Sequence, residues 1–296
     1  MATGIETFPA AAAGTITLGG DLIVNRIGYG AMRITGPGIW GPPQDKAAAL
    51  ATLRRAVELG VNFIDTADSY GPDVSEELIA EALAPYRNGE VITTKVGWTR
   101  HGAGVWQHNA SPAHIAEAIE GSLKRLRLDR IDIYQLHVPD PAVSFDASME
   151  AIARLKETGK VHHVGLSNVT LEHIKRAQKI VPIVSVQNRY SFNDREWDFV
   201  LDYCEQQGIA FLPWGPMAQG RQANDAVEKI ARNRGTTTAV VSLAWLLRRS
   251  PIILPIPGTG SVTHLEENVS AATFKLSDAE FEALNAVVPK PYWLRG

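Results

Sequence analysis

The sequence of 296 residues contains a single cysteine, Cys204, so a framework of disulfide bonds within the chain is excluded and a reducing compartment is favoured. It has no long basic run and a net charge of −3, so neither nucleic acid nor an anionic membrane is an expected partner. No apolar run approaches the ~18 residues of a membrane helix, and the N-terminal segment lacks the basic start and apolar core of a signal peptide. We therefore expect a cytoplasmic protein.

A glycine-rich dinucleotide motif is also missing, because no GxGxxG follows the first predicted strand, "RIGYGAM". The chain instead repeats a short apolar strand, a polar loop and an amphipathic helix, and eight such strands can be counted, ending with "IILPIPG". Each connection is a full crossover, which requires a parallel sheet. The number and length of the strands favour a closed (β/α)₈ barrel over an open sheet, and residues 1–296 are predicted to form one domain.

Three segments depart from the simple repeat. The runs "GTITL" and "LIVNRIG" flank Gly19-Gly20-Asp21, which predicts an N-terminal β-hairpin. Two helical patterns lie between strands seven and eight, so one of them is an insertion, and further helices follow strand eight up to the C-terminus. The stretch "GWTRHGAGVWQHNA" is expected to be a long loop.

Polar side chains close several of the apolar strands. Asp65, Lys95 and His137 end strands two, three and four, and Tyr70 follows in the loop after Asp65. Each alone has an ordinary structural explanation, as a turn residue, a rim charge or a packed histidine. The C-terminal strand ends of a barrel converge on one face, however, and four titratable groups there predict an active site.

The segments that carry these residues resemble a known family. "FIDTADSYG", "TTKVG", "YQLHVPD", "VGLSNV", "VQNRYS", "PWGPMAQG" and "LPIPGTGSVTHLEENV" are similar, in order and spacing, to the signature segments of the aldo-keto reductases, over about residues 15 to 290. The resemblance implies an NAD(P)H-dependent carbonyl reductase on a (β/α)₈ barrel, with a catalytic tetrad of Asp65, Tyr70, Lys95 and His137.

The chemistry of these residue types is consistent with carbonyl reduction. Hydride addition to a carbonyl leaves an alkoxide that must be protonated, and a tyrosine with a pKa near ~10 holds a proton at neutral pH. A nearby ammonium such as that of Lys95 lowers the pKa of the tyrosine. Asp65 would keep Lys95 charged, His137 would orient the carbonyl, and such acid–base help is worth ~10²–10⁴-fold in rate.

The resemblance also implies a cofactor site. Ser167, Asn168 and Gln187 match residues that hold the nicotinamide carboxamide, and Trp214 matches an aromatic ring stacked on the nicotinamide. The other implied cofactor residues are Gly215, Pro216, Met217, Gly258, Thr259, Ser261, His264, Glu267 and Asn268. Many relatives carry a lysine and an arginine, which select the 2′-phosphate of NADPH, where this chain has Gly258 and His264. We still expect NADP(H), with the phosphate held by Thr259, Ser261 and His264; NAD(H) is not excluded.

Aromatic residues in the loops suit a ring-bearing aldehyde or ketone. Trp40, Trp98 and Trp106 are the predicted substrate-binding residues, with further pocket walls expected from Tyr190, Phe192, Tyr292 and Trp293. The segments "GYGAMRITGPGIWGPP" and "PGTGSVTHLEENV" are most similar to bacterial reductases that include pyridoxal reductases. Pyridoxal is therefore one expected substrate, and a polycyclic ketone, such as a xenobiotic or a mycotoxin, is another.

Two other functional classes remain open. Some relatives act as cytosolic β-subunits of potassium channels, although the intact tetrad here favours an enzyme. A metal-dependent barrel hydrolase would need a His/Asp ligand cluster, and the close pair His162-His163 is expected to face opposite sides of its strand and to share no metal. We therefore predict no metal site, and the sequence does not indicate an oligomeric state.

Overall fold

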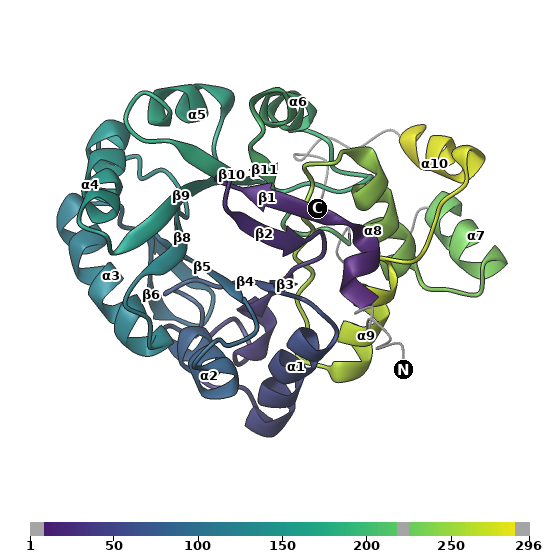
Figure 1. Ribbon diagram of the computed structural model, residues 1–296, viewed down its shortest axis with the longest axis horizontal. Coiled ribbons are helices and arrows are strands. Elements are labelled where there is room, and N and C mark those ends of the chain that lie inside the picture. Colours follow the sequence, from purple (N-terminus) through teal and green to yellow (C-terminus); the bar gives the residue numbers. More distant parts are fainter. Residues whose placement is uncertain (1–8, 218–224, 288–296) are drawn as a thin grey trace, which may run out of the picture.

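A parallel sheet is the centre of the computed structural model, which describes residues 9–217 and 225–287. Its seven strands pair in the order β11-β10-β9-β8-β5-β4-β3, and each adjacent pair is parallel. In chain order they are β3 (Tyr29–Gly30), β4 (Phe63–Asp65), β5 (Val91–Val96), β8 (Ile131–Leu136), β9 (Val161–Ser167), β10 (Ile183–Gln187) and β11 (Ala210–Phe211). The sheet curls into the wall of a barrel (Figure 1).

The segment 252–257 occupies the eighth position and closes the barrel. On one side Phe211 exchanges backbone hydrogen bonds of 2.9 Å with Ile252 and Leu254. On the other side the Gly28 amide donates to the Pro255 carbonyl at 2.8 Å, and the Gly30 amide donates to the Pro257 carbonyl at 3.3 Å. The two prolines have no amide hydrogen, so this segment forms a broken ladder instead of a regular strand. The predicted (β/α)₈ barrel is confirmed.

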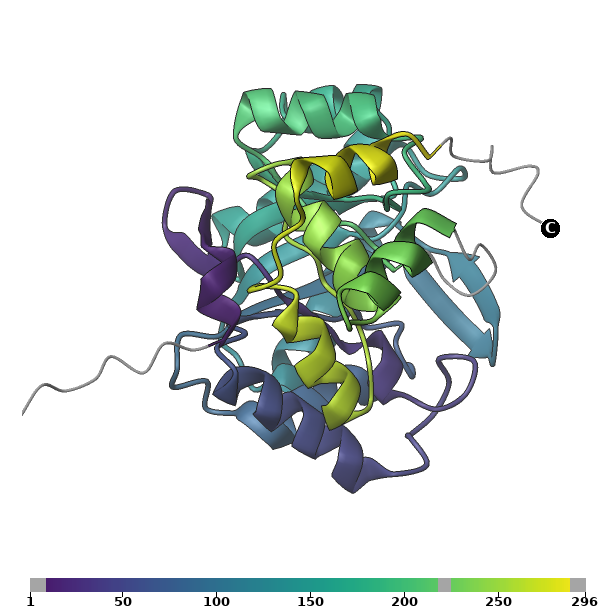
Figure 2. The ribbon, with the colours of Figure 1, turned by 90° about the vertical axis from the view of Figure 1, so that its right-hand side faces the viewer.

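Helices cover the outside of the sheet (Figures 1 and 2). They are α1 (Lys46–Glu58), α2 (Val74–Leu83), α3 (Pro112–Leu126), α4 (Phe145–Glu157), α5 (Leu171–Ala177), α6 (Asp198–Gln207), α7 (Asp225–Asn233), α8 (Thr238–Arg249), α9 (Val262–Ser270) and α10 (Asp278–Asn285). As predicted, two helices, α7 and α8, separate β11 from the closing segment, and α9 and α10 follow it. Within the described ranges, no helix has the length and apolar character needed to cross a membrane.

Local sequence signals fix the ends of several helices. Ser111 begins α3 by accepting the His114 amide at 3.3 Å, with Pro112 in the first turn, where no amide hydrogen is needed. Ser277 and Glu280 form a reciprocal capping box at the start of α10. Gly208 ends α6 in the left-handed conformation that glycine adopts without a steric cost.

The predicted N-terminal hairpin is present as β1 (Thr15–Leu18) and β2 (Leu22–Asn25). Its buried side chains, Leu18 and Val24, pack in one cluster with the barrel-interior residues Phe63, Val91 and Ile133. Phe63, Val91 and Ile133 lie at or near the starts of their strands. The hairpin therefore plugs the N-terminal end of the barrel and leaves the C-terminal end open for a site.

The segment predicted to be a long loop is a second antiparallel hairpin, so that prediction was wrong. Strands β6 (Trp98–Gly102) and β7 (Val105–His108) pair Trp98 with His108 and Arg100 with Trp106. The Arg100 guanidinium is largely buried, lies 3.7 Å from the centre of the Trp106 ring, and donates to the carbonyls of Ile39 and Ser69 at 2.8 and 3.0 Å. These contacts hold the hairpin over the open end of the barrel.

Candidate active site

The four side chains predicted to be catalytic lie together at the C-terminal end of the barrel. Asp65 ends β4, Lys95 lies near the end of β5, and His137 follows β8. The Lys95 ammonium donates to the Asp65 carboxylate at 2.7 Å and to the Thr66 carbonyl at 2.8 Å, and its Nζ lies 3.4 Å from the Tyr70 hydroxyl. An ammonium has three hydrogens to donate, so these contacts use its full capacity.

The Asp65 carboxylate is buried and saturated with donors. Its second oxygen accepts the side-chain amides of Gln135 and Gln187 at 3.2 and 2.9 Å. Gln187, predicted to hold the nicotinamide, thus has its amide nitrogen on Asp65. Gln135 was not predicted, because it lies inside β8 and the strand-end pattern of polar residues does not include it. These donors replace the hydrogen bonds with water that the carboxylate loses on burial.

Tyr70 retains its proton in this environment. Burial raises the pKa of Tyr70, and the nearby Lys95 charge only partly opposes the effect, so the pKa lies above its ordinary value of 10.0. The lysine does lower the pKa of Tyr70, as expected, but desolvation is the larger cause and the net shift is upward. Burial also disfavours the charge on Lys95, but Asp65 and Tyr70 outweigh it and the lysine pKa is raised. At neutral pH the pair is a phenol beside an ammonium.

His137 is a neutral imidazole at neutral pH. Burial, followed by the repulsive charge of Lys95, holds the pKa of His137 well below 6.5. Its ring meets the Tyr70 ring edge to face, with centroids 5.8 Å apart. Its Nδ1 has no hydrogen-bond partner within the described ranges. A neutral imidazole has one N–H to offer a ligand and no charge that must be balanced.

A cavity of about 880 Å³ opens in front of Tyr70 and His137. Lys95 is fully buried behind Tyr70 and does not line it. Of the predicted residues, the cavity is lined by Asp65, Tyr70, Trp98, Trp106, His137, Ser167, Asn168, Gln187, Trp214, Gly215, Pro216, Met217 and Gly258. Most of the predicted site residues therefore share one cavity.

Six further lining residues were not predicted: Gly30, Met32, Arg33, Val138, Arg189 and Ile256. Each lies at or just beyond a strand end, so the same strand-end rule, applied to residues without an obvious catalytic role, would have found them. At one wall the backbones approach very closely, since a Cβ on Gly258 would lie 2.6 Å from the Gly30 carbonyl oxygen. This wall is bare backbone because it has no room for side chains.

The loop after β9 ties the predicted cofactor residues to His137. Asn168 adopts a left-handed conformation, with φ of 55°, which asparagine tolerates better than most residues. Its side-chain amide donates to the His137 carbonyl at 3.0 Å, and its carbonyl oxygen accepts the Trp214 indole N–H at 3.0 Å. Trp214 keeps 37% of its surface exposed and lines the cavity.

The resemblance places six residues at the adenosine end of the cofactor. Gly258 lines the cavity, whereas the other five lie outside its lining, just before α9 or within it: Thr259, Ser261, His264, Glu267 and Asn268. Ser261 caps α9 without a side-chain capping bond, and its own amide donates to the Thr259 hydroxyl at 3.1 Å. Glu267 accepts the Thr237 hydroxyl at 2.5 Å. His264 is exposed and Asn268 is buried. Their cofactor roles remain predictions.

The predicted substrate residues differ in position. Trp98 and Trp106 line the cavity with ring centroids 5.8 Å apart, whereas Trp40 lies outside the lining and faces Arg100. The expectation for Tyr190 and Phe192 was wrong: both are buried and pack against Trp245 of α8 as part of the core. Tyr292 and Trp293 lie outside the described residues.

Comparison with known proteins places this site in a family. Residues 26–289 match the aldo/keto reductase family. The chain is 48% identical over 278 residues to an uncharacterized oxidoreductase of Schizosaccharomyces pombe, covering 93% of this chain and 90% of that protein. It is 42% identical over 280 residues to pyridoxine 4-dehydrogenase of Escherichia coli, covering 92% and 98%.

Solved structures agree with these matches. The thermostable aldo-keto reductase Tm1743, in complex with the inhibitor epalrestat, has a TM-score of 0.82 at 29% identity over 92% of this chain and 99% of its own. An aldo-keto reductase from Klebsiella pneumoniae, in complex with NADPH, has a TM-score of 0.80 at 27% identity over 94% and 96%. The family match spans most of the chain, and the relatives are matched over nearly their whole length. The chain therefore belongs to the aldo/keto reductase family.

Proposed function

We propose that this protein reduces a ring-bearing aldehyde or ketone to an alcohol, with NADPH as the reductant and Tyr70 as the proton donor. Family membership, together with the NADPH-bound solved relative, makes the chain an NADP-dependent aldo-keto reductase. The observation that carries the finer proposal is the Tyr70 hydroxyl, 3.4 Å from the Lys95 ammonium, on the wall of a cavity that also contains Trp98 and Trp106.

The cavity walls fit a nicotinamide nucleotide. Ser167 and Asn168 offer polar groups for a carboxamide, and Trp214 offers a partly exposed aromatic side chain. The bare backbone at Gly258 leads to the N-terminus of α9, where the Ser261 side chain makes no capping bond and the amides of the first turn favour a phosphate. Arg33 lies beside this wall, with its Cγ 3.6 Å from a Cβ placed on Gly258, so a cation is present near the position where many relatives carry a lysine. When bound, the nicotinamide supplies the hydride.

Residues of the chain then supply the proton that the reduced carbonyl oxygen needs. A carbonyl oxygen placed between Tyr70 and His137 would accept hydrogen bonds from the phenol and from the neutral imidazole. As charge develops on that oxygen, Tyr70 gives up its proton, and the Lys95 ammonium stabilises the resulting phenolate. Asp65 keeps Lys95 charged and fixed at 2.7 Å, so the donor needs little reorganisation during the reaction.

Aromatic walls and one relative support the substrate class. The Trp98 ring meets His137 edge to face with centroids 6.5 Å apart, and lies tilted against His108 with centroids 4.2 Å apart. An aromatic surface therefore lies next to the proposed carbonyl position. The relative named pyridoxine 4-dehydrogenase supports pyridoxal as the first substrate to test. A polycyclic ketone is the second.

The test compares NADPH consumption by the wild type and the Tyr70→Phe variant with pyridoxal, an aromatic aldehyde and a polycyclic ketone. We expect a loss of about 10²-fold or more in Tyr70→Phe, with unchanged NADPH binding measured by fluorescence titration. Tyr203→Phe is the control. The Tyr203 hydroxyl donates to the Gln178 side chain at 2.7 Å and does not line the cavity, so its loss should not alter turnover. Near-normal turnover in Tyr70→Phe would overturn the assignment. NADPH binding without turnover of any substrate would favour a regulatory subunit.

A further inference from the structure

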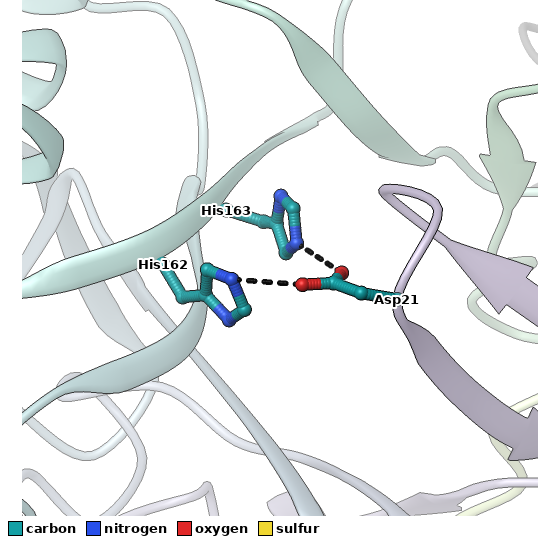
Figure 3. A group of neighbouring side chains, drawn as sticks. All are labelled: Asp21, His162 and His163. Carbon is teal, nitrogen blue, oxygen red and sulfur yellow. Dashed lines mark hydrogen bonds and ion pairs between the residues drawn. The ribbon is translucent and has the colours of Figure 1, made fainter.

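His162 and His163 do not face opposite sides as predicted, but converge on one carboxylate. His162 Nε2 lies 3.0 Å from one oxygen of Asp21, and His163 Nε2 lies 2.7 Å from the other. The two rings stack with centroids 4.1 Å apart (Figure 3). Strand alternation fixes the Cα–Cβ directions only, and an imidazole reaches far enough for both ring tips to bend toward the same partner.

We propose that Asp21, His162 and His163 form a binding site for a transition-metal dication such as Zn²⁺. One donor atom from each residue lies within 4.8 Å of the others, so small side-chain movements would bring all three to the 2.0–2.2 Å of zinc–nitrogen and zinc–oxygen bonds. Three protein ligands of this kind leave a fourth tetrahedral position for water.

The surroundings pack tightly against His163 and leave the carboxylate side of the cluster open. The side chains of His162 and His163 are 24% and 12% exposed, whereas that of Asp21 is 51% exposed, so an ion can approach from the carboxylate side. A Cβ on Gly19 would lie 2.2 Å from the His163 ring, which shows how tightly the hairpin turn packs against this imidazole. Fixed imidazoles reduce the entropy lost on binding.

The charged residues near the cluster, together with the ligand types, indicate which metal ion the site would bind. Arg130 and Lys156 act electrostatically on His162, while Asp132 adds a second carboxylate in the neighbourhood. This mixed balance does not favour an ion bound mainly by charge, such as Mg²⁺, which prefers oxygen ligands. Two imidazoles and one carboxylate favour zinc, copper or nickel.

The site is separate from the proposed chemistry. His162 and His163 lie near the start of β9, whereas Ser167, which lines the catalytic cavity, is its last residue. The four residue steps from His163 to Ser167 span about 13 Å. A metal bound here would link the turn of the β1–β2 hairpin to β9. It would therefore stabilise the packing of this hairpin against the N-terminal end of the barrel.

The experiment equilibrates the purified full chain with Zn²⁺ or Mg²⁺, removes unbound metal by dialysis, and counts the bound metal by mass spectrometry. We expect one zinc per chain in the wild type and in the control His101→Ala, whose imidazole is exposed on the other hairpin. Asp21→Asn and His162→Gln should each weaken zinc binding about 10-fold or more, since even changes behind a ligand cost 10–100-fold. No retention of Mg²⁺ is expected.

A second readout separates specific binding from misfolding. Zinc should raise the Tm of the wild type and slow amide exchange in the β1–β2 hairpin, and it should do neither in Asp21→Asn, while carbonyl reduction persists in that variant. Equal zinc binding in all four proteins, or no binding in the wild type, would overturn the proposal. So would a Tm increase that survives in Asp21→Asn.

Discussion

Replacing Asp65 with asparagine should destabilise the fold and remove turnover together. The Lys95 side chain is 0% exposed and its Nζ lies 2.7 Å from the Asp65 carboxylate. At an effective dielectric constant of about 20, charges at this separation attract by about 6 kcal/mol. Much of this attraction offsets the cost of removing the two ions from water. Removing one partner leaves the other charge buried without a counterion, which lowers the free energy of unfolding by about 3–5 kcal/mol. Urea denaturation of wild type and variant measures this difference.

The double variant Asp65→Asn/Lys95→Met separates stability from catalysis. It removes the uncompensated charge and leaves an apolar side chain of similar length in the same space, so we expect most of the lost stability to return. Turnover should remain about 10²-fold or more below wild type, because no ammonium is left to stabilise the phenolate of Tyr70. Recovery of turnover along with stability would show that the ion pair has only a structural role.

The exposed pair Lys46–Glu81 is a matched control for the same distance. Its atoms also lie 2.7 Å apart, but its side chains are 55% and 42% exposed. Glu81→Gln should therefore cost only about 0.2–1 kcal/mol. If Asp65→Asn is no more destabilising than Glu81→Gln, the reasoning from buried charge is refuted.

Three further predictions follow from the site. The pKa of Tyr70 is raised above 10.0 and that of His137 is lowered well below 6.5, so between these values Tyr70 stays protonated and His137 stays neutral. The value of kcat/KM for reduction should therefore be flat from about pH 7 to 9. A titration midpoint of kcat/KM inside that range would contradict the assignment. Gly258→Ala should lower the Tm and weaken NADPH binding, since its Cβ would lie 2.6 Å from the Gly30 carbonyl oxygen; an unchanged Tm would show that the wall can move apart. Arg33→Gln should raise the KM for NADPH without lowering kcat, and an equal rise in the KM for NADH would argue that Arg33 does not contact the 2′-phosphate.

The barrel and the core of the site were predictable because their signals are local. A short apolar strand that ends in an acid, as at Asp65, indicates in a few residues both where the strand lies in the barrel and that its last side chain belongs to the site. The same holds for Lys95 and His137, because strand order in a barrel brings consecutive strand ends together. Their meeting at one end of the barrel needed no knowledge of distant packing.

The errors came from contacts between segments far apart in the sequence. Tyr190 looked like a loop aromatic, and only its stacking on Trp245 of α8 shows that it belongs to the core. The hairpin of β6 and β7 lacks a regular apolar alternation, and its position depends on the bonds of Arg100 to Ile39 and Ser69. Convergence of His162 and His163 could not be predicted without the location of Asp21. Such contacts leave no period or motif in the chain.

The closure of the barrel has a consequence for how the protein is made. The Tyr29 hydroxyl donates to the Thr259 carbonyl across 230 residues of sequence, next to the seam between β3 and the closing segment. At roughly 5–20 residues per second, a ribosome would deliver this partner roughly 10–50 s after Tyr29. During that interval the open edge of β3 is a surface to which another nascent chain can pair. Slow synthesis or crowded expression should therefore affect the yield of this protein more than its final stability.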